Sequence, residues 1–122
     1  MPKRIDREGP IHRSIIDYLR NVLPGSVVYH PANEIDARGK NIARAIAKNK
    51  WNGTLPGYPD IICHYRGRTV LFEVKAPGNG LEKSQKAMRA ALEAQDIPYG
   101  LVRSIEDTKE CLGAWGITTT GR

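Results

Sequence analysis

Cysteine is scarce in this sequence, and long apolar runs, repeats and a phosphate-binding glycine loop are absent. Its two cysteines, Cys63 and Cys111, exclude a disulfide framework and show no zinc-ligand spacing. No G-x-x-x-x-G-K-[ST] motif occurs, so a P-loop nucleotidase is excluded. No apolar stretch approaches the about 20 residues of a membrane-spanning helix, and the first ten residues lack the apolar core of a signal peptide. We therefore expect a cytoplasmic protein without membrane association.

What the chain does contain is an ordinary globular composition with an excess of positive charge. Hydrophobic residues make up 40% of the 122 residues and charged residues 26%, which predicts one domain over residues 1–122. Nineteen Lys and Arg against thirteen Asp and Glu give a formal net charge of +6. This balance favours a polyanionic partner, although many basic proteins bind none.

The basic residues are densest in the segment ARGKNIARAIAKNK, residues 37–50. From about Asn41 the segment has a weakly helical pattern of apolar residues. A solvated helix face would explain its charge, and so would a surface that grips nucleic-acid phosphates. The second interpretation predicts DNA contacts from five residues: Arg38, Lys40, Arg44, Lys48 and Lys50.

Apolar periodicity and turn signals predict an alternation of helices and strands. Ser104 has a hydroxyl suited to cap the last helix, and the tail after it is expected to form a short edge strand or to be loose. A hairpin followed by a helix and another strand predicts an α/β fold with a mixed sheet and helices on its faces. The predicted elements are helix 8–23, strand 26–30, a weak helix from 41, hairpin strands 60–65 and 69–75, helix 81–95, strand 99–102 and helix 104–115.

Three charged residues interrupt the apolar hairpin: Asp60, Glu73 and Lys75. Strand residues two apart point to the same side, so Glu73 and Lys75 share a face. Asp60 opens the neighbouring strand, and a short turn between the two strands would bring it to the same sheet end. Charges in apolar strands are costly unless they are compensated. Their convergence indicates a functional site, whereas an E-x-K triplet alone would fit ion pairs on a solvated face.

A divalent metal ion would explain these charges. Two close carboxylates repel each other and favour a cation, and oxygen ligands suit Mg²⁺ or Mn²⁺. We expect Asp60 and Glu73 as ligands, with the backbone carbonyl of Val74 assisting. Lys75 would orient or deprotonate an attacking water, or stabilise the charge that develops on a phosphate. The predicted chemistry is metal-assisted hydrolysis of a phosphodiester.

Four stretches occur in order along the chain: GYPD at 57–60, EVK at 73–75, LEKSQ at 81–85 and YGLVRS at 99–104. Together they resemble the VRR-NUC family of the PD-(D/E)xK nuclease superfamily. The resemblance covers nearly the whole chain and is thinnest over residues 31–56. It implies a restriction-endonuclease-like α/β/α sandwich with a central mixed sheet, and a Mg²⁺-dependent endodeoxyribonuclease in which Mn²⁺ substitutes.

The resemblance also implies a role for individual residues. Asp60 and Glu73 would hold the metal, and Lys75 would be the catalytic lysine. Gln85 would point from its helix into the site. Glu8 would be the acidic residue that such nucleases supply to a metal-bound water, although a favourable charge at a helix start explains it equally well.

The predicted substrate is branched DNA such as a Holliday junction, because stand-alone members of the family look like junction-resolving nucleases of phages or mobile elements. A homodimer would present two active sites to two strands. Arg103, after the last strand, would contact DNA or be a solvated charge. One alternative is a sequence-specific restriction-type endonuclease, for which only residues 31–56 leave room to read bases. The other is a nucleic-acid-binding module that has lost activity.

Overall fold

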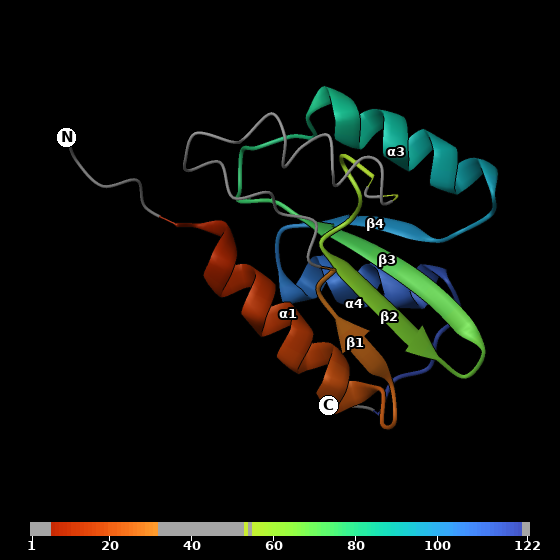
Figure 1. The fold of residues 1–122 in the computed structure, drawn as a ribbon. Helices are drawn as coiled ribbons and strands as arrows, with labels where there is room; N and C mark the ends of the chain where they lie inside the picture. Colours follow the sequence, from red (N-terminus) through yellow and green to blue (C-terminus); the bar gives the residue numbers. More distant parts are fainter. Residues whose placement is uncertain (1–5, 32–52, 54, 121–122) are drawn as a thin grey trace.

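A four-stranded mixed sheet forms the centre of the computed structural model, which describes residues 6–31, 53 and 55–120 (Figure 1). Its strands lie in the order β1-β2-β3-β4. β1 pairs with β2 and β2 with β3 in antiparallel fashion, whereas β3 and β4 are parallel. The predicted hairpin and mixed sheet are confirmed. The strands are β1 Val27–Tyr29, β2 Ile61–Tyr65, β3 Arg68–Val74 and β4 Tyr99–Val102.

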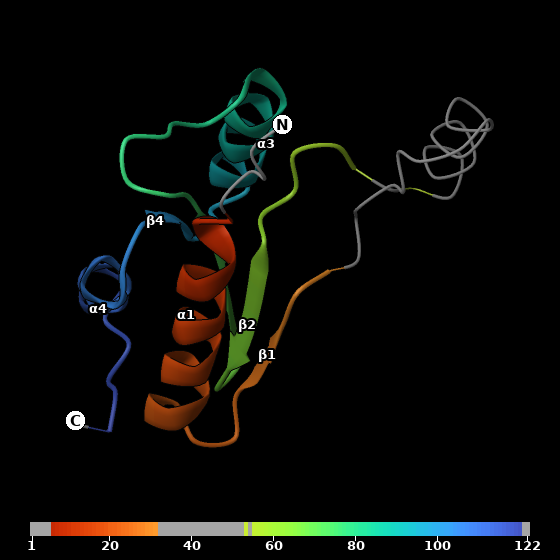
Figure 2. The same cartoon turned by 90° about the vertical axis from the view of Figure 1, so that its left-hand side faces the viewer.

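Three helices of the described residues cover the two faces of the sheet. Helices α1 (Glu8–Val22) and α4 (Ile105–Ala114) pack on one face, and α3 (Lys83–Ala94) contacts the other, as Figure 2 shows. This arrangement is the α/β/α sandwich that the sequence predicts. No helix in the described ranges is long and apolar enough to cross a membrane.

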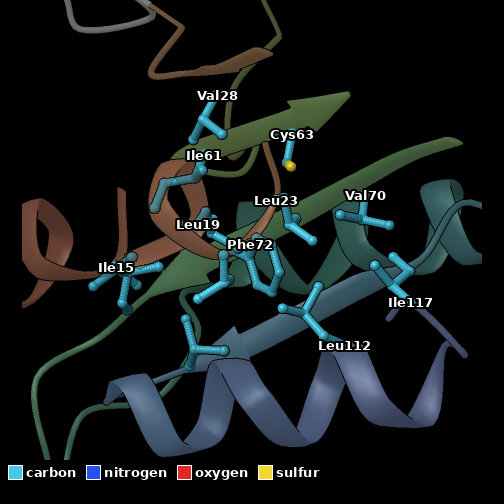
Figure 3. Packing of buried hydrophobic residues seen from close by; sticks show 13 residues of the cluster. Ile15, Leu19, Leu23, Val28, Ile61, Cys63, Val70, Phe72, Leu112 and Ile117 are labelled. Atoms are coloured by element: carbon cyan, nitrogen blue, oxygen red, sulfur yellow. The ribbon is translucent and has the colours of Figure 1, made fainter. Parts of the chain in front are cut away.

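The larger apolar cluster lies between the sheet and helices α1 and α4, where Phe72 packs beside Leu19 and Leu112 (Figure 3). Alternate residues of β3 enter it, since successive side chains of a strand point to opposite faces. Val74 belongs to this cluster, so Glu73 faces the other side, toward α3. The buried members are Ile15, Leu19, Val22, Leu23, Val28, Ile61, Cys63, Val70, Phe72, Val74, Val102, Leu112 and Ile117.

A smaller apolar cluster joins α3 to the opposite face of the sheet. Ile62, Leu71 and Tyr99 supply the sheet side, and Leu92 is the buried residue of α3. Leu92 lies in the C-terminal half of α3, so this cluster anchors that half of the helix to the sheet. The N-terminal end of α3 lies near the sheet end where β3 finishes, since Gln85 reaches Glu73 there.

Over residues 116–120, the part of the C-terminal tail that the structure describes, the chain forms neither an edge strand nor a loose end. The Thr120 backbone N–H donates to the Val22 carbonyl at 2.9 Å, and the Thr120 hydroxyl lies 3.3 Å from the same oxygen. Ile117 is buried beside this contact. The tail thus supplies partners to the carbonyls that the end of α1 leaves unsatisfied. The sequence did not indicate this contact, because its two partners are nearly a hundred residues apart.

Ser104→Ala is expected to destabilise the fold by about 1 kcal/mol through loss of a helix cap. The Ser104 hydroxyl accepts a hydrogen bond from the Asp107 N–H at 3.1 Å, as predicted. Ser104→Thr keeps the hydroxyl and should retain most of the stability. Urea denaturation of both variants measures the difference. Equal losses for Ala and Thr would show that the cap does not determine stability here.

Candidate active site

The sheet end where β2 begins and β3 finishes brings the predicted carboxylates together. Asp60 directly precedes β2, and its carboxylate accepts a hydrogen bond from the Val74 N–H at 2.9 Å. In the hairpin register Ile61 pairs with Phe72. Asp60 therefore lies beside Glu73 and Val74 at one corner of the sheet.

Glu73 is the most unusual residue of this corner, because glutamate is normally ionised and exposed to solvent, yet Glu73 is only 2% exposed. Its Oε1 atom is buried and has no hydrogen-bond partner, while its Oε2 accepts a weak hydrogen bond from Gln85 Nε2 at 3.3 Å. Burial raises the pKa of Glu73 to about 9, and the neighbouring Asp60 adds to that rise. Without a bound metal ion, burial and the neighbouring Asp60 thus favour the protonated form of Glu73.

The donor set fits a magnesium-type ion that keeps open coordination positions. Two neighbouring carboxyl groups, one with an unpartnered buried oxygen, gain the compensation they lack when a divalent cation binds. In the part of the chain that the structure describes, no group of three or more His, Cys, Asp or Glu could hold a metal. Mg²⁺ needs only one or two carboxylates, because waters and substrate phosphate oxygens complete its shell. The residues that would hold it are Asp60 and Glu73, with the Val74 carbonyl as a neighbouring oxygen.

Lys75 and Glu8 lie close enough to Glu73 to act on it electrostatically. Lys75 is only 8% exposed, and its charge opposes the rise in the Glu73 pKa, whereas Glu8 adds to that rise. The Lys75 N–H donates to the Val102 carbonyl at 3.1 Å, which anchors its backbone beside β4. Glu8 is the first residue of α1 and is half-buried. It is an acidic first-turn residue whose charge acts on Glu73, and its role toward a metal-bound water stays a prediction.

Gln85 is oriented by the way helix α3 begins. Its Oε1 accepts from the Glu82 N–H at 2.8 Å, forming a capping box at the helix start. Its Nε2 consequently turns toward Glu73. The structure thus places Gln85 beside the carboxylates, and the cap holds its amide in one orientation.

Gly57 packs against the same helix start. Its φ of +78° is one that residues with a side chain rarely adopt, and an added Cβ would lie 2.5 Å from the Ser84 carbonyl oxygen. This close approach joins the loop before Asp60 to the turn that carries Gln85. Glycine is therefore required here for space as well as for backbone conformation.

Gly57→Ala is expected to destabilise the protein by more than about 1–3 kcal/mol, the cost of backbone strain alone. Gly25→Ala is the matched control, because Gly25 has a φ of +82° but nothing within 4 Å of its would-be Cβ. Thermal unfolding of both variants isolates the effect of crowding against α3. Equal destabilisation would show that the approach to Ser84 is not tight.

Two histidines that no local sequence pattern groups with the site lie next to Asp60. His30 Nδ1 is 2.6 Å from the Asp60 carbonyl, and because a carbonyl only accepts, Nδ1 is the donor. The His12 ring meets the His30 ring edge-on at a centroid distance of 4.9 Å. The pairing of β1 with β2 explains the position of His30: Tyr29 pairs with Ile62, which places the next residue, His30, near Asp60.

Two hollows lie at the start of α1, and both are bordered by Asp6 and Glu8. The larger, of about 780 Å³, also reaches Lys75 and is lined in full by Asp6, Arg7, Glu8, Lys75, Ala76, Gly78, Asn79, Gly80 and Glu82. The smaller, of about 330 Å³, reaches Asp60 and is lined by Asp6, Glu8, Gly9, His12, Arg13, His30, Asp60 and Val74.

Arg103 lies near the site, but its guanidinium is engaged by the protein. It donates to the Asn79 carbonyl at 2.7 Å, while the Arg7 guanidinium donates to the Pro77 carbonyl at 2.7 Å. The two arginines thus hold the loop that follows Lys75. DNA contact by Arg103 stays a prediction. The five basic residues predicted between positions 38 and 50 lie outside the described residues.

Comparison with known proteins adds one match, at the level of structure. No family model matches the sequence, and no curated protein matches it. A solved structure described as a VRR_NUC domain superposes with a TM-score of 0.63, covering 91% of this chain and 99% of that one. The chain has the fold of a VRR-NUC domain. The two sequences are only 14% identical, so the match extends to the fold alone.

Proposed function

We propose that this protein is a metal-dependent nuclease that hydrolyses phosphodiester bonds of DNA. The observation that carries the proposal is the buried Glu73, which has an unpartnered oxygen beside Asp60 and Lys75 at one sheet end. A buried carboxyl beside the half-buried Asp60 and the largely buried Lys75 is costly for stability alone. The likeness to a VRR_NUC domain supports the same assignment.

The proposed chemistry assigns a task to each residue of the corner. Asp60 and Glu73 hold the cation, which supplies Lewis-acid polarisation of the phosphate and activation of a water when it is bound. Lys75 orients the attacking water or stabilises the charge that develops on the phosphate oxygens. Gln85 fixes the Glu73 carboxylate through its amide. Glu8 adds negative charge near the cation.

The finer features of the proposal are magnesium as the ion, branched DNA as the substrate and a homodimer as the active form. Mg²⁺ fits because the two carboxylates leave coordination positions for waters and phosphate oxygens. A domain of 122 residues offers limited surface to a duplex, and two copies would offer two sites to two strands. Branched DNA presents such paired strands at one place.

A cleavage assay on a panel of DNA forms tests the proposal. Labelled four-way junction, flap, single strand and linear duplex are incubated with the protein in Mg²⁺, Mn²⁺ or EDTA. We expect cutting in either metal, none in EDTA, and the fastest cutting on a branched form. Cutting confined to one duplex sequence would indicate a restriction-type enzyme. Binding without cutting in both metals would indicate a module without activity and overturn the proposal.

A further inference from the structure

The wall that α1 contributes to the smaller hollow changes in charge along the helix. Glu8 and His12 are four residues apart and so share one face, and Gly9 and Arg13 are related in the same way. The wall therefore begins with a carboxylate near Asp60 and continues with a histidine and an arginine one turn, or about 6 Å, farther on. The Asp6 carboxylate occupies the space beside Gly9, where an added Cβ would meet it.

The acidic residue at the rim is already engaged by the helix start. The Asp6 carboxylate accepts a hydrogen bond from the Gly9 N–H at 2.8 Å. Arg13, by contrast, is exposed and makes no ion pair or hydrogen bond within the part of the chain that the structure describes. An unpaired guanidinium bordering a hollow is suited to a phosphate, which it can bind through two parallel hydrogen bonds.

The opposite wall of the smaller hollow is held in place by hydrogen bonding and ring packing. The His30 ring is fixed by its Nδ1–H on the Asp60 carbonyl, and the ring of His12 packs against it. Segments far apart in the chain thus meet here: α1, the residue after β1 and the residue before β2. The hollow is shaped before any ligand enters, which lowers the entropic cost of binding one.

We infer that one strand of the DNA substrate runs from the larger hollow, past Glu8, into the smaller hollow. The phosphate to be cut then lies at Asp60 and Glu73, beside Lys75, and the next phosphate along the strand contacts Arg13. This inference rests on the proposed function and adds the strand path and a phosphate subsite. Arg13 contributes binding and register without reading sequence, because phosphate contacts position a strand and carry no base information.

The test compares the salt dependence of DNA binding for Arg13→Gln and Arg66→Gln. Arg66 is the matched control: it carries the same charge but lies in the β2–β3 turn, at the other end of the hairpin from Asp60. Fluorescence anisotropy measures the Kd of a labelled flap in EDTA, where no cutting occurs. The salt slope is the steepness with which the logarithm of the binding constant falls as the logarithm of the salt concentration rises. Losing one phosphate contact lowers this slope by about 0.7–0.9. Between about 50 and 200 mM salt, the wild-type Kd should therefore rise about threefold more than that of Arg13→Gln.

Steady-state cleavage provides a second readout. Arg13→Gln should raise KM while leaving kcat within about twofold of wild type, because a neighbouring phosphate is bound equally in ground and transition states. Arg66→Gln should keep the wild-type salt slope and KM. Circular dichroism checks that both variants are folded.

The outcomes separate this inference from the proposed function. If the two variants show the same salt slope, the strand path is wrong, even when the wild type cuts DNA. A second outcome is that the wild type has a steeper salt slope than Arg13→Gln but cuts no DNA in Mg²⁺ or Mn²⁺. In that case the strand path stands and the nuclease proposal fails. If no DNA form binds, both are overturned.

Discussion

Glu73→Gln is expected to abolish metal-dependent cleavage while leaving the metal-free protein at least as stable as wild type. The amide keeps the size of the side chain and can still accept the hydrogen bond from Gln85. It cannot act as an anionic ligand, and losing several kcal/mol of metal-derived stabilisation lowers the rate by about a thousandfold or more. Few substitutions should separate activity from stability so completely.

The stability half of this prediction follows from the pKa of Glu73. In the unfolded chain the carboxyl ionises near 4.5, and in the folded protein it holds its proton until about pH 9. Folding therefore takes up a proton between these values, and wild-type stability falls as the pH rises through that window. A neutral amide has no such dependence. The stability advantage of Glu73→Gln in EDTA should thus grow from about pH 4.5 toward pH 9.

The measurement pairs single-turnover cleavage in Mg²⁺ with urea denaturation in EDTA at several pH values. Glu110→Gln, an exposed position on α4, is the matched control and should alter neither result. Wild-type cleavage by Glu73→Gln would remove Glu73 from the proposed metal site. A large loss of stability would show that the ionised carboxylate holds the fold together.

Lys75→Met is expected to lower kcat by about 10²–10⁴-fold, the usual contribution of a positioned acid–base group. Methionine has a similar unbranched, apolar stem, so the packing of this largely buried side chain is retained while the ammonium is removed. KM should change little, because the ammonium acts mainly on charge that develops during the reaction.

Single-turnover rates of Lys75→Met on the best substrate in Mg²⁺ test this role. Lys86→Met, on an exposed position of α3, is the control for removal of one positive charge. If both variants lose activity equally through KM, Lys75 contributes general attraction of DNA. A wild-type kcat for Lys75→Met would exclude it from the chemistry.

The sequence was most informative where the interacting residues are close along the chain. A hairpin with a short turn places Asp60 beside Glu73. Because successive side chains of a strand point to opposite faces, Glu73 faces away from the core cluster that Val74 enters. The hydroxyl of Ser104 likewise predicts the start of α4. Such features follow from local backbone geometry, so the amino-acid sequence is sufficient to predict them.

The contacts that the sequence did not predict depend on the order of strands and on helix packing. His30 reaches Asp60 only because β1 pairs with β2, and His12 joins it only because α1 packs on the face of the sheet beside β1. Arg103 is a lone charge in the sequence, and its bond to Asn79 depends on the path of the loop after β3. No local pattern encodes these contacts between distant segments.

The central claim is that Asp60 and Glu73 hold a divalent cation that the activity requires. The most direct measurement is anomalous scattering from crystals soaked in Mn²⁺, for wild type and Glu73→Gln. We expect a manganese peak between the Asp60 and Glu73 carboxylates that Glu73→Gln lacks. Metal-dependent cleavage by a protein that shows no peak at this corner, or a peak elsewhere, would contradict it.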